Sequence, residues 1–329
     1  RMNDNKQPDP MAVLIYGAGA VGLGIGSCLL KAGVQTGFLG RLQTAEALRQ
    51  NGLRRTGIFG RVFIQPSDFT VFDNPDQIPA NRFDHVLVCT KSSDSKEAAD
   101  QLANRRPILR PNGKIILFQN GWGNAEIFAR RFPPKMIYNA RVITGFIRRR
   151  LNHVEVTVHA DSIHIGSLFG QPNQPLEELC QKIAAGGIPC QTTTEIGKDL
   201  WAKMLYNCAL NPLGAILDVP YGTLARYPST QEIMNHLIDE TFEVMTASGF
   251  SAHQNTAEEF RQVFYDRLVP ATADHRSSTL QDLKAGRKTE IQALTGAVLQ
   301  LGKQHGKTVP YSRFLYQLIQ FIESQRKPD

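Results

Sequence analysis

The chain has 329 residues, enough for about two domains of roughly 150 residues each. Apolar residues make up 42% and charged residues 20% of the chain, which excludes a disordered or fibrous protein. Lysine and arginine outnumber aspartate and glutamate by 37 to 30, and the resulting net charge of +7 suits an anionic small-molecule substrate. The densest basic cluster, Arg148–Arg150, is short, and we interpret it as a solvated strand end or turn rather than as a nucleic-acid-binding surface.

The five cysteines are scattered and form no C-x-x-C pair, which favours free thiols over a disulfide framework. The eight histidines are scattered as well, and no cluster of histidine, cysteine or carboxylate residues indicates a metal site. Residues 1–10 are polar and show no signal-peptide pattern. These features predict a cytoplasmic protein without a metal ion.

Residues 11–30 carry no charge, and an uncharged run of this length can cross a membrane. A buried parallel strand followed by a closely packed helix produces the same kind of run. Glycines at positions 17, 19 and 22 follow the strand-like segment Ala12–Tyr16 (AVLIY), and a helical pattern continues to Ala32. A second strand is expected at Gln35–Leu39. The glycine spacing therefore favours the strand and helix over the membrane span.

The segment Gly17–Gly22 reads GAGAVG, the G-x-G-x-x-G pattern of a dinucleotide-binding turn. Gly17 permits the tight turn, Gly19 lets the backbone approach a pyrophosphate, and Gly22 lets the helix pack against the strand. The N-terminus of the helix adds free N–H groups for phosphate oxygens. The alternative is a glycine-rich turn that binds nothing. We expect the cofactor to contact Gly17, Ala18, Gly19, Ala20, Val21 and Gly22.

The residue that follows the second strand indicates which dinucleotide binds. Enzymes that use NAD place an aspartate or glutamate about twenty residues after the glycines, where it binds the ribose hydroxyls. This chain has Arg41 there instead. A guanidinium group matches a 2′-phosphate, so Arg41 predicts NADP(H). The alternative is that Arg41 is only a surface cation.

Strand and helix patterns alternate over the first half of the chain, which predicts a doubly wound parallel sheet. Further strands are expected at Arg61–Ile64, Thr70–Phe72, Phe83–Thr90 and Lys114–Phe118, with helices at Asp94–Ala103, Asn124–Phe132 and Leu176–Gly186. The segments Asn139–Phe146, Val154–Val158 and Ser162–Ile165 are expected as antiparallel strands added to that sheet, and Pro189–Thr193 as a last extended segment. We therefore predict a Rossmann-like NADP-binding domain at residues 11–195.

Residues 196–329 show helical spacing without strand patterns, which predicts an all-helical substrate domain. Helices are expected at Asp199–Leu217, Thr230–Ser248, Thr256–Phe264, Ser278–Ala285, Glu290–Gln304 and Ser312–Ser324. Pro212 should kink or end the first of these helices. Gly286 should break the chain between Ser278 and Glu290, because in one straight helix these two residues would lie about 18 Å apart.

Polar residues recur on one face of the first helix of this domain, at Lys203, Asn207 and Asn211. The rest of the helix is largely apolar, so these side chains should face a polar site; an exposed stripe of a half-buried helix is the alternative. Asn120 and Lys91 each follow a predicted parallel strand, where ligand-binding residues collect in such sheets. Taken alone, Asn120 could be a turn residue and Lys91 a surface lysine.

Four segments together resemble the ketopantoate reductase family. These are GAGAVG at Gly17–Gly22, QNGWG around Asn120, LWAKMLYNCALNPLGAI at Leu200–Ile216 and SSTLQDLKAGRKTEI at Ser277–Ile291. The resemblance extends from Val13 to about Leu318 and implies a Rossmann-type domain followed by a helical domain like the C-terminal domain of 6-phosphogluconate dehydrogenase. It also implies NADPH-dependent reduction of 2-dehydropantoate to pantoate on the route to pantothenate and coenzyme A.

The resemblance further assigns roles to individual residues. Lys203 would be the catalytic acid, and Glu290 would act in catalysis beside it. The substrate would be held by Asn120, Asn207, Asn211, Ser278 and Glu290, and Lys91 and Asn120 would lie near the cofactor. The chain departs from the family pattern at His275, where an asparagine is common, and at Asp94, where some members have glutamine.

The chemistry of the residues agrees with a reductase, because hydride addition to a ketone builds negative charge on oxygen and Lys203 can meet that charge. Two alternatives remain open. One is a related NADP-dependent dehydrogenase of another hydroxy acid or a polyol phosphate, and the other is a catalytically silent NADPH-binding regulator. The expected partner is a small 2-oxo acid, with no nucleic acid or membrane, and the chain is a possible homodimer.

Overall fold

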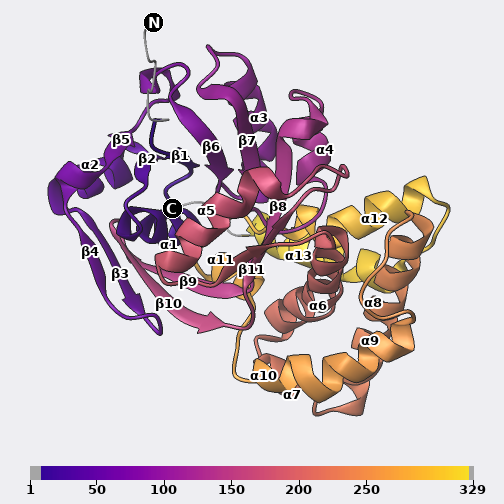
Figure 1. Cartoon of the computed structure of the whole chain (residues 1–329). Helices are drawn as coiled ribbons and strands as arrows, with labels where there is room; N and C mark the ends of the chain where they lie inside the picture. Colours follow the sequence, from indigo (N-terminus) through magenta and orange to yellow (C-terminus); the bar gives the residue numbers. More distant parts are fainter. Residues whose placement is uncertain (1–8, 326–329) are drawn as a thin grey trace, which may run out of the picture. The chain divides into compact units, whose positions relative to one another are not determined.

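The computed structural model describes residues 9–325, and the chain divides into two compact units (Figure 1). Unit 1 holds the residues up to Gln119 together with Ala125–Ile196. Unit 2 holds Asn120–Asn124 and the residues from Gly197 onward. The short segment Asn120–Asn124 is therefore part of unit 2, although both of its neighbours along the chain belong to unit 1.

Unit 1 is built on an eight-stranded sheet with the order β12-β11-β8-β7-β6-β1-β2-β5. Every neighbouring pair is parallel except β11 and β8. This arrangement confirms the predicted doubly wound α/β fold. The strands are β1 (Ala12–Tyr16), β2 (Gln35–Leu39), β5 (Thr70–Phe72), β6 (Phe83–Val88), β7 (Leu109–Leu117), β8 (Ile137–Arg141), β11 (Ile163–Gly166) and β12 (Cys190–Thr192).

Helices pack on both faces of this sheet, as the alternation along β1 shows. Val13 and Ile15 join a core that includes buried residues of α1 and α5, whereas Leu14 and Tyr16 join a second core with residues of α3 and α4. All five residues of β1 are buried because the strand is covered on both faces. The helices of unit 1 are α1 (Ala20–Lys31), α2 (Leu42–Asn51), α3 (Ser95–Ala103), α4 (Asn124–Ala129, whose first residue is counted with unit 2) and α5 (Gln174–Ala185).

A second sheet of four strands has the order β4-β3-β10-β9. It contains β3 (Leu53–Gly57), β4 (Val62–Ile64), β9 (Thr144–Arg150) and β10 (His153–His159). The expectation that the strands after residue 139 all extend the main sheet is therefore wrong for β9 and β10, which pair with each other and, through β10, with β3. The cause is a long-range parallel pairing of β10 with β3, which the sequence pattern does not reveal.

Strand β3 escaped prediction because its sequence LRRTG looks like a polar loop. Arg55 in its middle is nevertheless fully buried. Its guanidinium donates hydrogen bonds to Ser27 Oγ (3.1 Å), Cys28 Sγ (2.9 Å) and the carbonyl of Gly186 (2.9 Å). These contacts compensate for moving a charge out of water, so a strand forms where charge alone would predict a loop.

Unit 2 is helical, as predicted. From Gly197 onward, its helices in the described chain are α6 (Ile196–Leu217), α7 (Tyr221–Leu224), α8 (Pro228–Ala247), α9 (Ala257–Val263), α10 (Val269–Ala271), α11 (Ser278–Lys284), α12 (Thr295–Gln304) and α13 (Pro310–Gln325). Helix α6 does not end at Pro212 but continues to Leu217. The following Leu213 and Ala215 are buried, and their packing offsets the loss of the proline N–H, so an ending at Pro212 is ruled out.

Between residues 9 and 325 no helix has both the length and the apolar character needed to cross a bilayer. The uncharged run at residues 11–30 is divided between strand β1 and helix α1, with the glycine-rich turn between them. All five cysteines are free thiols.

Candidate active site

The glycine-rich turn after β1 is packed so tightly that glycine is required at two positions. Gly17 has φ = 113°, and a Cβ there would lie 2.8 Å from the backbone nitrogen of Thr90. A Cβ on Gly22 would lie 2.1 Å from the carbonyl oxygen of Gly17 and 2.8 Å from Ile15 Cγ2. These contacts explain the first and third glycines of the motif as packing requirements.

Gly19 is different, because a Cβ there would meet nothing within 4 Å. The middle glycine is thus not needed for packing inside the protein, and its Cα borders open space. Gly19 is also the N-cap of α1, where no side chain caps the helix and the first turn has no acidic residue. The N–H groups of Ala20, Val21 and Gly22 lie at this positively polarised end. The turn therefore fits a pyrophosphate.

Arg41 follows β2 and is the N-cap of α2, with extended backbone angles and an exposed side chain. In the chain from residue 9 to 325 its guanidinium makes no hydrogen bond or ion pair. The preceding Gly40 lies against the glycine-rich turn, since a Cβ on Gly40 would be 3.1 Å from Ala18 Cβ. Arg41 therefore directly follows a residue that lies against the glycine-rich turn.

The ends of β6 and β7 are joined by Gln119, a residue that the sequence pattern did not single out. Its Nε2, with two N–H donors, lies within hydrogen-bond distance of three acceptors: Thr90 Oγ1 (3.2 Å), the carbonyl oxygen of Lys91 (3.2 Å) and Ser95 Oγ (2.7 Å). The Gln119 side chain is buried, and its Oε1 has no hydrogen-bond partner among the described residues. The one signal in the sequence is a polar residue directly after the buried strand KIILF. Lys91 is half-buried at this same edge of the sheet.

In unit 2 three of the expected site residues meet. Lys203 Nζ donates a hydrogen bond to Asn120 Oδ1 at 2.5 Å. Asn120 Nδ2 donates to Glu290 Oε2 at 3.3 Å. Asn120 therefore links a cation and a carboxylate that are 87 residues apart in the sequence, and its amide orientation follows from the fact that lysine can only donate.

The segment Asn120–Asn124 is fixed to unit 2 by its backbone. Gly121 has φ = 86°, and a Cβ there would lie 2.4 Å from the carbonyl oxygen of Ala293. The N–H of Trp122 donates to the same carbonyl at 2.8 Å. Buried Asn124 donates through Nδ2 to the carbonyl of Asn120 at 3.0 Å. The Asn-Gly pair thus does more than form a turn: its glycine allows the backbone to approach the backbone of Ala293 closely.

Aromatic side chains hold the same segment against α6. The ring centroids of Trp122 and Trp201 lie 4.8 Å apart, and Phe250 packs edge-on to Trp122 at 4.7 Å. Both tryptophans are buried. Trp201 lies two residues before Lys203, so this packing brings the Asn120 segment to the helix that carries the lysine.

The predicted break between Ser278 and Glu290 is confirmed. Helix α11 ends at Lys284, Gly286 has φ = 65°, and α12 begins only at Thr295. Ser277 caps α11 by accepting a hydrogen bond from the N–H of Leu280 at 3.0 Å, and it is fully buried. Ser278, the next residue, is exposed at the start of the helix, so its hydroxyl remains accessible.

The asparagines on α6 have different surroundings. Asn211 is buried, and its Oδ1 accepts a hydrogen bond from the hydroxyl of Tyr221. Asn207 is half-buried, and its side chain makes no hydrogen bond within residues 9–325. Burial raises the pKa of Tyr221, so its hydroxyl stays protonated and keeps donating to Asn211. Asn211 is thus held by a partner within unit 2 through its Oδ1, whereas the Asn207 side chain has no such partner among the described residues.

His275, which the resemblance marks as a departure from the family pattern, packs edge-on against Tyr221 with a centroid distance of 5.4 Å. Partial burial lowers the pKa of His275 below its ordinary value, which favours the neutral ring. Its carbonyl accepts a hydrogen bond from the N–H of Tyr221 at 3.0 Å. His275 thus supports the residue that in turn binds Asn211.

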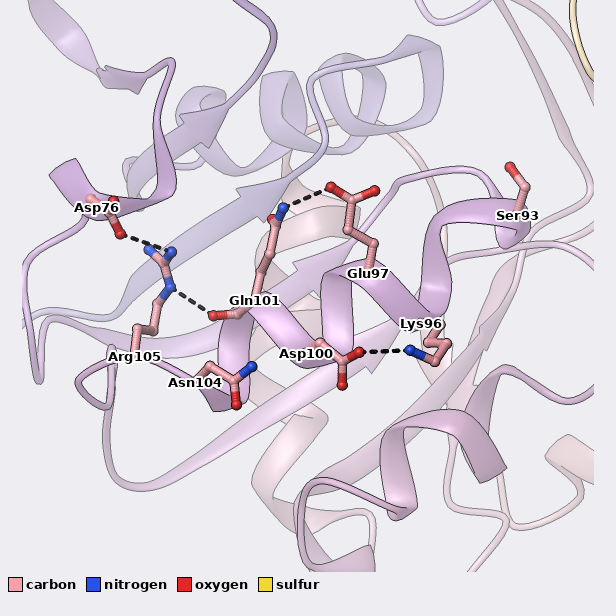
Figure 2. A pocket seen from close by; sticks show the side chains of 8 residues that line it. All are labelled: Asp76, Ser93, Lys96, Glu97, Asp100, Gln101, Asn104 and Arg105. Atoms are coloured by element: carbon pink, nitrogen blue, oxygen red, sulfur yellow. Dashed lines mark hydrogen bonds and ion pairs between the residues drawn. The ribbon is translucent and has the colours of Figure 1, made fainter.

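A polar hollow of about 600 Å³ lies beside α3 (Figure 2). Its side chains bind one another: Lys96 pairs with Asp100 at 3.0 Å, and Gln101 donates to Glu97 at 2.8 Å. It is lined by Asp76, Ser93, Lys96, Glu97, Asp100, Gln101, Asn104 and Arg105. None of the predicted site residues is among them, so this hollow does not define the active site.

Unit 1 contains a glycine-rich βαβ motif, and unit 2 is helical and bears a lysine in a polar cluster. This architecture is typical of a two-domain nicotinamide-dependent oxidoreductase. Two family models match the chain, "Ketopantoate reductase PanE/ApbA" over residues 13–170 and "Ketopantoate reductase PanE/ApbA C terminal" over residues 195–323. The chain belongs to the ketopantoate reductase family.

Individual relatives agree with the family models. The chain is 35% identical over 314 residues to the 2-dehydropantoate 2-reductase of Aquifex aeolicus, covering 95% of this chain and 97% of the relative. It is 29% identical over 317 residues to the enzyme of that name from Archaeoglobus fulgidus, covering 95% and 98%. A ketopantoate reductase structure from Ralstonia eutropha JMP134 has a TM-score of 0.82 at 29% identity, covering 96% and 99%. A D-mandelate dehydrogenase with NADH, 20% identical, shares the fold with a TM-score of 0.84, covering 96% of this chain and 99% of that one.

Proposed function

We propose that this protein reduces 2-dehydropantoate to pantoate with NADPH. The observation that carries the proposal is the contact of Lys203 Nζ with Asn120 Oδ1, because it holds a proton donor in a polar cluster with Glu290. Membership of the ketopantoate reductase family and the identity to 2-dehydropantoate 2-reductases support the choice of substrate.

NADPH, when bound, supplies the hydride. The protein must then meet the negative charge that develops on the ketone oxygen. Lys203 has three N–H donors, and Asn120 accepts one of them. The ammonium group can stabilise the alkoxide and pass a proton to it, so Lys203 acts as general acid. Asn120 orients the ammonium group and, through its Nδ2, also the carboxylate of Glu290.

Other polar groups of unit 2 would bind the rest of the substrate. The exposed hydroxyl of Ser278 and the side chain of Asn207 can donate to the substrate carboxylate. Asn211 has its Oδ1 engaged by Tyr221, which leaves its amide N–H groups to donate. Glu290 can accept a hydrogen bond from the terminal hydroxyl of pantoate.

In unit 1 the backbone of Gly17–Gly22 would hold the pyrophosphate, and Arg41 would bind the 2′-phosphate that distinguishes NADPH from NADH. Lys91 and Asn120 would lie near the nicotinamide. The free cysteines support a reducing, cytoplasmic location for this activity. A homodimer is part of the proposal as its possible assembly.

The function is tested by following NADPH oxidation with ketopantoate and with a panel of other 2-oxo acids. We expect the highest kcat/KM with ketopantoate. A higher value with another 2-oxo acid would favour the related dehydrogenase, and His275, in place of the common asparagine, is the first residue to examine in that case. NADPH binding without turnover of any substrate would favour the regulator.

A further inference from the structure

Arg148 behaves differently from its neighbours in the basic cluster Arg148–Arg150. It lies in β9 of the small sheet of unit 1, but its side chain reaches α2, where Nη2 donates to Thr44 Oγ1 at 2.6 Å. The same nitrogen donates to the carbonyl of Leu151 at 2.9 Å. Arg149 instead pairs with Glu155 on β10. The expectation of a solvated strand end is therefore wrong for Arg148, which is half-buried.

Arg148 is brought close to a second guanidinium group. Thr44 lies in the first turn of α2, and Arg41 is the N-cap of that helix. Burial and the charge of nearby Arg41 lower the pKa of Arg148. The first turn of α2 contains no acidic residue, and within residues 9–325 neither guanidinium pairs with a carboxylate.

The donors of Arg148 are not all used. Its Nε is buried without a hydrogen-bond partner in the described chain. A buried donor without an acceptor costs free energy. The repulsion between two like charges that lie close together costs free energy as well. A bound anion would relieve the repulsion between the two guanidinium groups. The glycine-rich turn is adjacent, because a Cβ added to Gly40 would lie 3.1 Å from Ala18 Cβ and 3.4 Å from Thr44 Cγ2.

We infer that Arg148 binds the 2′-phosphate of NADPH together with Arg41, so that cofactor selection uses one arginine from each of the two sheet regions of unit 1. The inference rests on the proposed use of NADPH. Guanidinium groups match phosphate oxygens through paired N–H donors, and two of them balance the double charge of a phosphate monoester. Thr44 holds Arg148 in place by accepting one of its hydrogen bonds.

The test measures binding rather than turnover. Dissociation constants for NADPH, NADH, 2′,5′-ADP and 5′-AMP are determined by calorimetry for the wild type and for Arg148→Gln. We expect NADPH and 2′,5′-ADP to bind about tenfold more weakly to the variant, the lower range for a hydrogen bond to a charged group. NADH and 5′-AMP should change by less than about twofold. Arg149→Gln is the matched control on the same strand and should leave all four constants unchanged.

Equal losses for ligands with and without the 2′-phosphate would show a structural role and overturn the inference, as would an unchanged preference in Arg148→Gln. If that variant does not fold, Arg41→Ala decides: it should still bind 2′,5′-ADP more tightly than 5′-AMP, and equal binding overturns the inference. A wild type that binds NADPH and NADH equally would instead overturn the cofactor part of the proposed function.

Discussion

The indole rings of Trp122 and Trp201 pack with their centroids 4.8 Å apart and so join the two chain segments that carry Asn120 and Lys203. Each tryptophan is two residues from the polar residue on its segment. The hydrogen bond between Lys203 and Asn120 is therefore supported by a neighbouring apolar contact between two buried rings. The position of the Lys203 ammonium group therefore depends on the packing of two tryptophans as well as on its hydrogen bond to Asn120.

The backbone approach at Gly121 gives a test of this support. Gly121→Ala should lower both stability and kcat, because the new Cβ would lie 2.4 Å from the Ala293 carbonyl oxygen. Gly123→Ala is the matched control: its φ of 100° is also unfavourable for alanine, but a Cβ there meets nothing within 4 Å. We expect Gly123→Ala to cost about 1 kcal/mol of backbone strain and Gly121→Ala clearly more. Urea unfolding and steady-state kinetics measure both, and equal effects would contradict this explanation.

Lys203→Ala should lower kcat with ketopantoate by at least about a hundredfold, because a general acid contributes 10²–10⁴-fold. NADPH affinity should hardly change. Lys203→Arg should restore little activity, since arginine keeps the charge but releases a proton reluctantly. Lys303→Ala, an exposed lysine on α12, is the control. Near-normal kcat in Lys203→Ala would move the role of acid to Lys91.

Arg41→Ala should weaken NADPH binding by about 1.5–3 kcal/mol, the contribution of a charged hydrogen bond, and leave NADH nearly unchanged. Fluorescence titration with both cofactors measures the difference. Arg49→Ala, in the last turn of the same helix, serves as a control, because Arg49 is paired with Asp73 at 2.7 Å. A similar loss for both cofactors would exclude a 2′-phosphate role for Arg41.

His85 in β6 should make the fold sensitive to acid. Burial lowers its pKa from 6.5 to about 4, and its Nδ1 has no hydrogen-bond partner in the described chain. The folded state thus binds this proton less readily than the unfolded state. The resulting stability is complete above about pH 6.5 and is lost as the pH falls towards 4, a total of about 3 kcal/mol.

The check is urea unfolding of the wild type and His85→Gln at several pH values between 7 and 4. The variant should show a correspondingly flatter decline, whereas His305→Gln, on an exposed residue, should follow the wild type. Parallel curves for the wild type and His85→Gln would show that other groups cause the acid sensitivity.

Much of unit 1 could be predicted because its strands are short apolar runs between turn residues. The predicted bounds of β1, β2 and β5 agree with the structure. Strand β3 could not be predicted, because Arg55 is buried through contacts with α1 and with Gly186, which lies 131 residues away. Local sequence carries no information about such partners.

The same reason limits prediction of the site. The position of Asn120 after a strand and of Lys203 on an apolar helix marked both as candidates, but no spacing rule relates them to each other. Their contact depends on the packing of Gly121 against Ala293, a pairing of residues more than 170 positions apart. Gln119 was missed because one buried glutamine after a strand has no distinctive pattern.

Because Asn120–Asn124 belongs to the helical unit, that unit cannot be exchanged between relatives as one continuous stretch of chain. A chimaera made by one cut near Ile196 would combine the helices of one parent with the Asn-Gly-Trp segment of another. The foreign tryptophan would then have to match Trp201 and Phe250, and the foreign backbone would have to fit Ala293. A graft of the helical unit therefore has to carry these five residues with it, inserted far upstream in the recipient chain.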